Sequence, residues 1–542
     1  MAIDPRSGYS PATKTFHSLR PAVAFPPVSQ PLSITAYAVS LLPNRLPSHP
    51  AFIDASNSVS LSYPNLVSQI HSLASSLHSH LGISEGHVAF ILCPSCLEIP
   101  VLYLALLSLG AIITPANPAS TPSELSRLID VAVPTHFFAT SSSSSKLPRH
   151  VTPILIDSHE FRSFLESGSP LSDPIEIRQS DPAAILFSSG TTGHVKGVLL
   201  SHRNIITETI PFISILRLQD RPHPTVHMLT APPFHVYGVV FLIKSVVVGE
   251  TTVIQTERFD PEKMIGAIER FGVTHLALSP PALLAMVRVC EQVGDRRRGL
   301  GSLEVVNCGG APSPPVLIRR FNGLFPNVAF QQGYGLTEST GGVFRCLGLE
   351  ENRRVGSCGR LAAHCEAKVV DPESGVALPP GKPGELWIRG PTIMAGYVGD
   401  SEATAAVLDS EGWLKTGDLC YIDEDGFLFV VDRLKELIKC KGYQVPPAEL
   451  EQLLQEHPDI TEAAVVPYPD EEAGQIPMAF IVRQSHITLS EAQVMDFINK
   501  QVAHYKKIRR VKFVNSIPRN ASGKILRRDL IKLATLTLSS KL

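Results

Sequence analysis

A regular alternation of two sequence patterns most constrains the fold of this chain. Short apolar runs of strand length, rich in β-branched residues, alternate with helical patterns through roughly the first 430 residues. The strand-like runs cover residues 88–92, 152–156, 183–187, 252–255, 275–278 and 305–307. Because such an alternation packs helices against layered sheets, it predicts an α/β architecture.

The length predicts more than one domain, because 542 residues exceed what a single core usually serves. After a turn at 423–426 and an apolar run at 427–431, the sequence becomes more helical and more charged. We therefore predict a large N-terminal domain over residues 1–432 and a small α+β domain over 433–542. The small domain should contain helices near 448–456 and 490–501, strands near 463–466 and 479–482, and a basic tail.

Composition and charge favour small-molecule partners. The net charge is −2 from 48 basic and 50 acidic residues, and without a long basic run we expect no nucleic-acid or membrane-surface partner. The most apolar stretch, 99–113, is shorter than the roughly 20 residues that span a bilayer and contains Pro100, Ser108 and Gly110. We read it as a buried helix leading into a strand, and expect no membrane span. The first 30 residues do not have the apolar core of a signal peptide.

Nine cysteines are scattered along the chain. Cys93 and Cys96 are close in sequence, as are Cys358, His364 and Cys365, but neither group has the full ligand set of a structural zinc site. We expect neither metal sites there nor disulfides. The serine run at 141–145 is expected to be a loop tip.

A loop rich in glycine and hydroxyl residues follows the strand-like run at 183–187. It reads Ser188-Ser189-Gly190-Thr191-Thr192-Gly193-His194-Val195-Lys196-Gly197. Glycines let backbone N–H groups turn toward an anion, hydroxyls add donors, and the lysine supplies positive charge, so the loop is suited to phosphates. It is not a Walker A motif, because Lys196 is followed by glycine rather than serine or threonine. Taken alone, the loop could also be an ordinary surface turn.

Further motifs follow in order along the chain. They are Pro233-Phe234-His235, Gly309-Gly310-Ala311-Pro312, Gln332-Gly333-Tyr334-Gly335-Leu336-Thr337-Glu338, Thr416-Gly417-Asp418, Asp432-Arg433-Leu434-Lys435 with Lys441-Gly442-Tyr443-Gln444, and the segment 518–524 that ends in Lys524. With these motifs the chain resembles the adenylate-forming superfamily of acyl-CoA synthetases and luciferases. The resemblance covers nearly the whole chain and is closest to the plant 4-coumarate:CoA ligase-like acyl-CoA synthetases.

The resemblance implies a two-step reaction. A carboxylic acid reacts with ATP to give an acyl-adenylate and pyrophosphate, and the CoA thiol then displaces AMP to form a thioester. ATP and CoA would be co-substrates and Mg²⁺ the cofactor. The implied fold has a large N-terminal domain of α/β subdomains with a small β-barrel, followed by a small mobile lid.

The same resemblance assigns the nucleotide site. The residues implied to hold the β and γ phosphates are Ser188, Ser189, Gly190, Thr191, Thr192 and Lys196. Glu338 is the implied Mg²⁺ ligand, Tyr334 the residue near adenine, and Asp418 the ribose acceptor with Arg433 as its partner. The other implied nucleotide contacts are Gly310, Ala311, Gln332, Gly333, Thr337, Lys435 and Lys439.

Catalysis is implied to depend on Lys524, which bridges the substrate carboxylate and the nucleotide, and on His235. Because Lys524 would occupy the side from which CoA must enter, the resemblance implies a lid that rotates about a hinge within 432–435. Rotation would bring Lys441 and Gly442 to the CoA site, where Arg258 is a further candidate.

The implied acyl pocket is bordered by His235. The lining positions are Tyr237, Phe241, Gly309, Gly333, Gly341, Gly342 and Val343. Hydroxycinnamate ligases tend to have Pro-Val-Leu where this chain has Gly-Gly-Val, so the sequence predicts a longer or wider pocket. A fatty acid, a jasmonate precursor or an extended aryl-alkenoic acid is the expected substrate, with 4-coumarate as the alternative. Whether nearby Arg345 faces the substrate stays open.

The last three residues, Ser540-Lys541-Leu542, match the signal read by the peroxisomal import receptor, so the expected location is the peroxisomal matrix. Three other functions share parts of the pattern: a luciferase-like oxygenase, an adenylation module that feeds a carrier protein, and an inactive acyl- or nucleotide-binding regulator. Retention of Lys196, Glu338 and the lid lysine speaks against the regulator.

Overall fold

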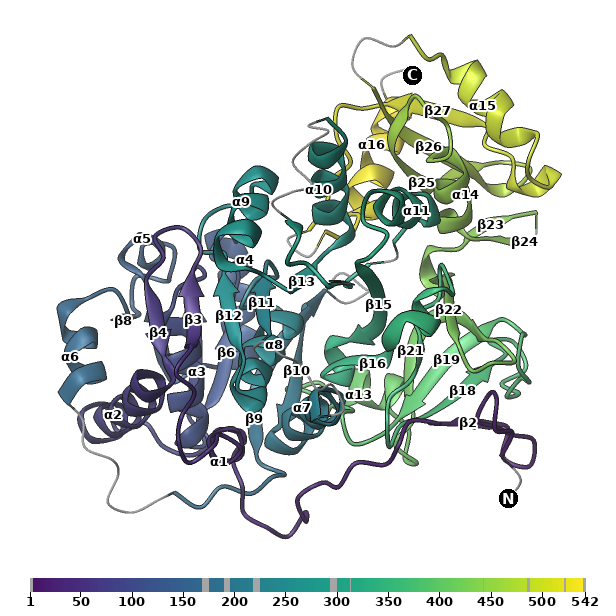
Figure 1. Cartoon of the computed structure of the whole chain (residues 1–542). Helices are drawn as coiled ribbons and strands as arrows, with labels where there is room; N and C mark the ends of the chain where they lie inside the picture. Colours follow the sequence, from purple (N-terminus) through teal and green to yellow (C-terminus); the bar gives the residue numbers. More distant parts are fainter. Residues whose placement is uncertain are drawn as a thin grey trace.

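The computed structural model describes residues 3–167, 175–189, 195–217, 225–292, 300–311, 313–441, 443–484, 488–520 and 523–539. These residues form a multidomain α/β protein with three sheets in a large N-terminal part and a fourth in a smaller C-terminal domain (Figure 1). The predicted fold class is thereby confirmed.

A seven-stranded sheet carries the glycine-rich loop. Its order is β20 (Gly396–Tyr397), β10 (Val195–Ser201), β9 (Pro182–Ser189), β6 (Ile112–Pro115), β5 (Val88–Leu92), β7 (His136–Ala139) and β8 (Ile154–Leu155). The strands from β9 to β8 are parallel to one another, whereas β9 and β10 form an antiparallel pair. The apolar stretch 99–113 is the buried helix α3 (Glu98–Ser108) followed by β6, as predicted.

A nine-stranded sheet carries the motifs near residues 309 and 334. Its order is β17 (Arg360–Leu361), β16 (Gly341–Arg345), β15 (Ala329–Leu336), β14 (Val305–Cys308), β13 (His275–Leu278), β11 (Val226–Leu229), β12 (Thr251–Ile254), β3 (Pro50–Asp54) and β4 (Ser60–Ser62). The strands from β15 to β3 are parallel. Ligands of open parallel sheets bind at the carboxyl ends of the strands, and Gly309 follows the end of β14.

Helices cover these two sheets. They are α1 (Ile34–Ser40), α2 (Tyr63–Leu81), α3, α4 (Pro122–Ala132), α5 (Ser141–Ser144), α6 (His159–Ser167), α7 (His202–Arg217), α8 (Val236–Val248), α9 (Pro261–Phe271), α10 (Pro280–Gln292), α11 (Pro315–Leu324) and α12 (Gly348–Asn352). Separate core clusters form beneath them: α1, α2, α3 and α8 belong to one, and α9, α10 and α11 to another. α8 is apolar around most of its circumference and is buried against α3 and α7. The expected loop tip at 141–145 is wrong: residues 141–144 form the short helix α5, whose start is held by the Thr140 N–H donating to Ser143 Oγ at 3.1 Å and the Ser143 N–H donating to the Thr140 carbonyl at 3.0 Å.

The small β-barrel was predicted for the N-terminal domain without a place along the chain, and the antiparallel sheet of that domain is the third sheet. It is six-stranded and antiparallel, in the order β1 (Tyr9–Ser10), β2 (Thr15–His17), β18 (Glu366–Val370), β19 (Gly384–Arg389), β21 (Leu414–Ile422) and β22 (Leu428–Arg433), with α13 (Ser401–Val407) beside it. The N-terminal segment therefore pairs with strands more than 300 residues away, as β2 and β18 show in Figure 1.

The C-terminal domain has its own core, from Ile438 to Ala534. Its sheet has the order β24 (Tyr443–Val445), β23 (Ile438–Cys440), β26 (Gly474–Arg483) and β25 (Ile460–Asp470), with β27 (Arg510–Phe513) parallel to β26. Its helices are α14 (Pro447–Leu454), α15 (Glu491–Asn499) and α16 (Arg527–Ser539). The two helices and two strands predicted within 433–501 are all present, although β25 and β26 are longer than expected.

The sequence leads us to expect neither a membrane span nor disulfides, and the structure bears on both only for the described residues. Within them no helix is both long and apolar enough to cross a membrane. All the cysteines are free thiols, and eight of the nine are buried.

Candidate active site

The glycine-rich loop connects the antiparallel strands β9 and β10, whose register places Ser188 opposite Lys196. Residues 190–194 lie outside the described residues, so the roles predicted for Gly190, Thr191 and Thr192 stay predictions, as does that of Ser189, of which the structure describes only the backbone. The Ser188 hydroxyl is buried and has no hydrogen-bond partner among the described residues. A buried donor with no partner among the described residues fits a site that binds phosphate oxygens.

Tyr397 links the predicted phosphate lysine to the predicted metal ligand. The Lys196 ammonium lies 4.4 Å from the centre of the Tyr397 ring, and the Tyr397 hydroxyl donates to Glu338 Oε1 at 3.0 Å. β20 pairs with β10 and brings the tyrosine there. Burial and the charge of Glu338 raise the pKa of Tyr397, so the phenol stays neutral and keeps its proton for this bond. No sequence motif marked Tyr397.

The residues around Glu338 fit a Mg²⁺ ion bound mainly by a nucleotide. Mg²⁺ commonly takes only one or two protein carboxylates and completes its octahedron with water and substrate phosphates. The described residues contain no group of three or more His, Cys, Asp or Glu side chains that could hold a metal by themselves. A single carboxylate, oriented by a tyrosine and close to Lys196, suits the shared mode of binding.

Removing the Tyr397 hydroxyl is expected to weaken this arrangement. In Tyr397→Phe the ring under Lys196 remains but Glu338 loses a donor, and a hydrogen bond to a charged group contributes roughly 1.5–3 kcal/mol. We expect kcat/KM for ATP to fall by about tenfold, with a higher Mg²⁺ requirement at fixed ATP. Tyr421→Phe is the matched control, because it removes the hydroxyl of a β21 tyrosine whose ring stacks on Phe429 of β22. Equal effects of the two variants would rule out the role given to Tyr397.

A triad of two buried side chains and one half-buried arginine lies at the boundary between the second and third sheets. The Tyr334 hydroxyl donates to Asp418 Oδ2 at 2.6 Å, and Arg433 Nε lies 2.9 Å from Asp418 Oδ1. The register of β21 and β22 makes Asp418 and Arg433 direct cross-strand neighbours. The structure thus brings together three of the residues assigned to adenosine.

Burial dominates the electrostatics of this triad. It raises the pKa of Asp418, and the positive charge of Arg433 offsets part of the effect. Because both Asp418 oxygens already have partners, a ribose hydroxyl would share or replace the Tyr334 contact. The position of Tyr334 against adenine stays a prediction; here its ring meets the edge of Phe344 at a centroid distance of 6.3 Å.

The strand ends beside the triad leave room for a planar group. Gly310 has a φ of +87°, which favours glycine, and a Cβ added at Gly309 would meet no atom of the described residues within 4 Å. Ala311 follows them, while Gln332 in β15 and Thr337 after it are buried. Open space next to a required glycine is consistent with the predicted adenine position.

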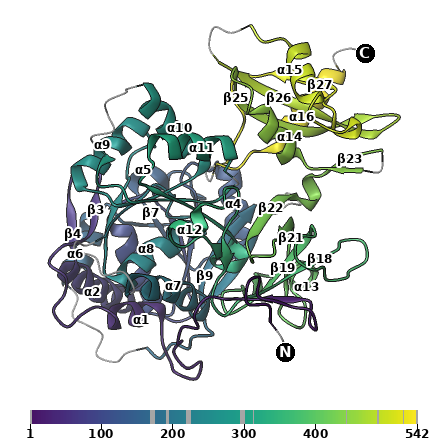
Figure 2. The same ribbon diagram turned by 45° about the vertical axis from the view of Figure 1, so that its right-hand side comes forward.

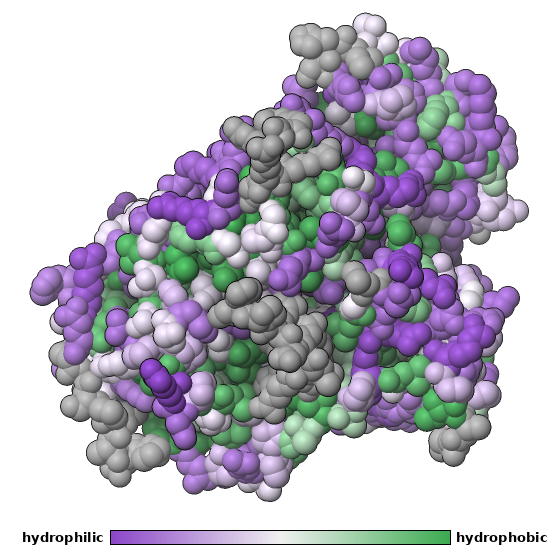
Figure 3. All heavy atoms as spheres, viewed as in Figure 1, coloured by the Kyte–Doolittle hydropathy of each residue, from purple (hydrophilic) through white to green (hydrophobic). Residues whose placement is uncertain are grey.

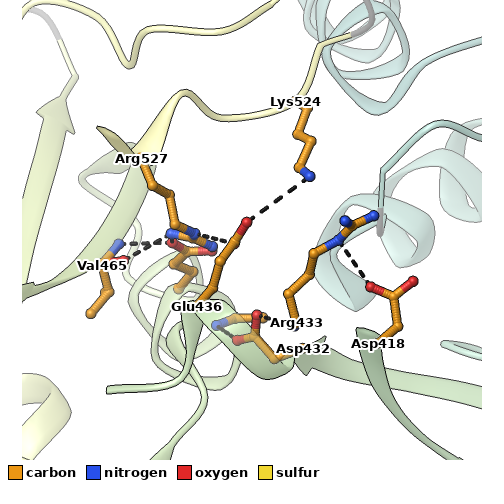
Figure 4. Close-up of polar contacts among 9 residues, drawn as sticks. Asp418, Asp432, Arg433, Glu436, Val465, Lys524 and Arg527 are labelled. Carbon is orange, nitrogen blue, oxygen red and sulfur yellow. Dashed lines mark hydrogen bonds and ion pairs between the residues drawn. The ribbon is translucent and has the colours of Figure 1, made fainter. Parts of the chain in front are cut away.

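Lys524 of the C-terminal domain points toward Glu436 and the side of Arg433 (Figure 4). Its Nζ lies 4.0 Å from Glu436 Oε1, and Glu436 is held in turn by Arg527 Nε at 2.6 Å. A tight turn fixes the lysine backbone, because Asn520 N–H donates to the Lys524 carbonyl and Asn520 Oδ1 accepts from the Lys524 N–H. Burial and the nearby Arg433 lower the pKa of Lys524, whereas Glu436 opposes the shift.

The turn that carries Lys524 packs on the large domain. Gly523 has a φ of +83°, and a Cβ there would lie 3.0 Å from Pro281 Cγ at the start of α10. Between the C-terminal domain and the six-stranded sheet the surface is hollowed, with hydrophilic residues on both sides (Figure 3). The described arrangement therefore has the lysine turned toward residues that the sequence predicts to bind the nucleotide.

The candidate CoA residues are not brought together. Lys441 is exposed at the turn between β23 and β24, and this hairpin projects away from the large domain in both ribbon views (Figures 1 and 2). Arg258 is exposed between β12 and α9, and α9 lies far from the β23–β24 hairpin in both ribbon views. Gly442 lies outside the described residues. Lys435 and Lys439 are also exposed, outside the triad.

The predicted acyl residues cluster on α8, β15 and β16. His235 caps α8: its Nδ1 accepts from the Tyr237 N–H at 3.3 Å, and burial lowers its pKa, which favours neutral imidazole. Tyr237 meets Phe241 edge to face at 6.1 Å, and Val343 is buried.

The space released by the paired glycines of β16 is filled. A Cβ at Gly342 would lie 2.8 Å from Arg345 Nε, and one at Gly341 would lie 3.0 Å from Glu208 Oε1. The two glycines therefore do not by themselves lengthen the pocket, because charged side chains occupy the volume. Arg345 points to this side, which the sequence had left open, and Glu208 was missed because nothing in its surroundings forms a motif.

Comparisons with known proteins agree with this geometry. The AMP-binding enzyme family model matches residues 42–398, and the AMP-binding enzyme C-terminal domain model matches residues 449–524. The chain is 48% identical over 558 residues to 4-coumarate--CoA ligase-like 9 of Arabidopsis thaliana, covering 100% of this chain and 98% of the relative. It is 44% identical over 549 residues to Peroxisomal OPC-8:0-CoA ligase 1 of Arabidopsis thaliana, covering 98% and 99%. The solved o-succinylbenzoate CoA synthetase of Bacillus subtilis, in complex with ATP and magnesium ion, superposes with a TM-score of 0.77 at 26% identity, covering 92% of this chain and 99% of that one.

Proposed function

Because the chain belongs to the AMP-binding enzyme family, we propose that it is an ATP-dependent ligase that joins a carboxylic acid to CoA through an acyl-adenylate. One observation carries the proposal: Lys524 of the C-terminal domain lies beside Glu436, where the charges of Asp418 and Arg433, paired across β21 and β22 at the domain junction, act on it. Binding of a nucleotide alone would not need a lysine supplied across a domain boundary.

In the first half reaction, the substrate carboxylate attacks the α-phosphorus of ATP and pyrophosphate leaves. Negative charge gathers where the carboxylate and triphosphate meet, so positioning and electrostatic stabilisation are the main contributions of the protein. Lys524 would neutralise this charge, Lys196 and the Ser188 hydroxyl would hold the leaving phosphates, and Asp418 would orient the ribose. A Mg²⁺ ion held by Glu338 would supply charge neutralisation on the phosphate oxygens.

In the second half reaction, the CoA sulfur attacks the acyl carbon and AMP leaves. The β23–β24 hairpin projects away from the large domain, whereas the turn that carries Lys524 packs on Pro281 of that domain. This difference supports a rotation of the C-terminal domain about 432–435, as a mobile lid over 433–542 attached to the domain 1–432. Asp432 lies at this junction: it accepts from the N–H of Arg433 at 2.7 Å and from the N–H of Ala448, at the start of α14, at 2.8 Å.

The proposed substrate is a fatty acid, a jasmonate precursor or an extended aryl-alkenoic acid, and the proposed location is the peroxisomal matrix through the import receptor. The similarity to a relative named as a peroxisomal CoA ligase supports the location. The C-terminal tripeptide that would carry the signal lies outside the described residues.

The two half reactions should differ in pH dependence. Because burial and Arg433 lower the pKa of Lys524, its ammonium loses the proton at a lower pH than an exposed lysine does. We expect adenylate formation to decline as the pH rises through this lowered pKa, whereas thioester formation from supplied acyl-adenylate should not follow that decline. Single-turnover rates of both steps across the alkaline range provide the measurement, and parallel profiles would contradict the assignment.

The proposal is tested by incubating the protein with ATP, Mg²⁺, CoA and acids from hydroxycinnamates to C18 fatty acids. We expect AMP and acyl-CoA in equal amounts, without light emission or oxygen uptake. Preference for 4-coumarate over all larger acids would correct the substrate class, and oxygen uptake would replace the ligase by an oxygenase. Binding of an acid or a nucleotide without conversion of any acid would instead support an inactive acyl- or nucleotide-binding regulator.

A further inference from the structure

A buried ion pair lies among the predicted acyl-pocket residues. Glu208 of α7 is 4% exposed, and its Oε1 contacts Arg345 at the end of β16. The N–H of Gly342 donates to the same oxygen at 3.2 Å. The side chain of Arg345 is 16% exposed, so both charges are largely removed from water.

The pair faces positions assigned to the acyl chain. Arg345 is the cross-strand neighbour of Gly333, and a Cβ at Gly333 would lie 3.8 Å from Arg345 Cγ. Its guanidinium covers Gly342, and its charge reaches Tyr237. The absence of side chains at the glycines is therefore what admits a guanidinium into this wall.

The backbone of Arg345 is fixed from outside the pocket. Arg20 donates to the Arg345 carbonyl at 2.9 Å, and Arg20 is held by Glu351 through contacts of 2.6 and 2.7 Å. This clamp joins the N-terminal segment to the end of β16, so the guanidinium starts from a defined position.

Burying two charges costs desolvation free energy, and a pocket wall that contacts only hydrocarbon does not need them. Replacing a buried ion pair by apolar residues of similar volume is often neutral or stabilising. Burial raises the pKa of Glu208 to about 7 although Arg345 and the Gly342 N–H lower it, so the pair does not fully compensate its desolvation. Charged groups gain nothing from a methylene chain, whereas a guanidinium binds oxygen acceptors well.

We propose that the Glu208–Arg345 pair determines acyl specificity by favouring acids with a neutral oxygen acceptor, such as a ketone or hydroxyl, in the part of the chain distant from the reacting carboxylate. A second carboxylate is disfavoured where Glu208 is ionised, because Glu208 then neutralises Arg345 and repels another anion. This inference rests on the proposed ligase function and names the chemistry of its substrate.

The experiment compares matched acids of one chain length: a saturated acid, the same acid with a ketone in its distal half, and the corresponding dicarboxylic acid. We expect wild-type kcat/KM for the keto acid to exceed that for the saturated acid by about tenfold or more, since a polar site discriminates strongly against an analogue without the polar group. The dicarboxylic acid should be the poorest of the three.

Variants then separate the pair from the rest of the pocket. In Glu208→Gln/Arg345→Met, which keeps the volume but removes both charges, the preference for the keto acid should disappear and kcat/KM for the saturated acid should rise. Arg345→Lys keeps the charge but not the planar fork, and should retain only part of the preference. Arg353→Met, which removes an exposed arginine beside α12, should keep the wild-type ratio.

The outcomes distinguish this inference from the function on which it rests. No acyl-CoA from any acid would remove the ligase proposal. Acyl-CoA formation with a keto-to-saturated ratio near one in the wild type, or the same ratio in the wild type and the double variant, would overturn the role of the pair while leaving the ligase intact. Circular dichroism shows whether the double variant folds. If it does not, the keto-to-saturated ratios of kcat/KM in the wild type and in Arg345→Lys test the role of the pair.

Discussion

Replacing Lys524 with alanine is expected to reduce the rate of acyl-adenylate formation by about 10²–10³-fold, the usual effect of removing one group that stabilises charge in a transition state. Lys524 is positioned for this step by its turn and by Glu436, close to the Asp418–Arg433 pair. Thioester formation from supplied acyl-adenylate should be largely retained, because the proposed rotation turns the lysine away before CoA reacts. Rapid-quench measurements of acyl-adenylate and acyl-CoA formation separate the rates of the two half reactions.

Lys532→Ala is the matched control, because Lys532 belongs to the same domain and its side chain is 76% exposed. It should leave both rates close to wild type. Equal loss of both half reactions in Lys524→Ala would contradict the proposed division of labour and the rotating lid.

Replacing Asp418 with asparagine is expected to affect both ATP use and stability. The change removes the charge that pairs with Arg433, and breaking one side of a buried ion pair typically costs about 3–5 kcal/mol. The amide also has only one acceptor oxygen for the Tyr334 hydroxyl and the ribose together. We expect a fall in the free energy of unfolding in this range and a decrease in kcat/KM for ATP of about 100-fold, corresponding to about 2.7 kcal/mol.

Denaturant unfolding and steady-state kinetics at several ATP concentrations provide the two measurements. Asp425→Asn is the control, because Asp425 pairs with Arg6 and Arg354 at the surface, where ion pairs contribute little. Wild-type kcat/KM for ATP in a folded Asp418→Asn protein would show that the carboxylate does not contact the nucleotide.

The predictable part of the fold was the part with strong periodicity. The strand-like runs at 88–92 and 275–278 are β5 and β13, because buried parallel strands form continuous apolar runs. The two-residue strands β1 and β20 carry no such pattern, and only partners far away in sequence determine that they pair. The short helix α5 was missed because serine capping, not apolar spacing, defines it.

The candidate site likewise contains residues that sequence motifs predict and residues that only the folded structure identifies. Tyr334, Asp418, Arg433 and Lys524 lie in motifs, and the structure brings them together. Tyr397, Glu208 and Glu436 lie outside the motifs, and only strand pairing and packing place them at the site. Tyr397 is placed by the pairing of β20 with β10, and Glu208 by the packing of α7 on β16. Glu436 is placed by the short helix Leu434–Glu436 after β22, which lies next to Lys524. Arg345 could be noticed in the sequence, but whether it faced the pocket depended on its pairing with Gly333.

Acid-dependent exchange of labelled pyrophosphate into ATP, measured without CoA, is the most direct test of the central claim that an acyl-adenylate forms on this protein. Wild-type protein should catalyse the exchange only when an accepted acid is present, and later addition of CoA should release AMP and acyl-CoA in equal amounts. The absence of exchange with an acid that is converted to acyl-CoA, or formation of ADP instead of AMP, would contradict the account.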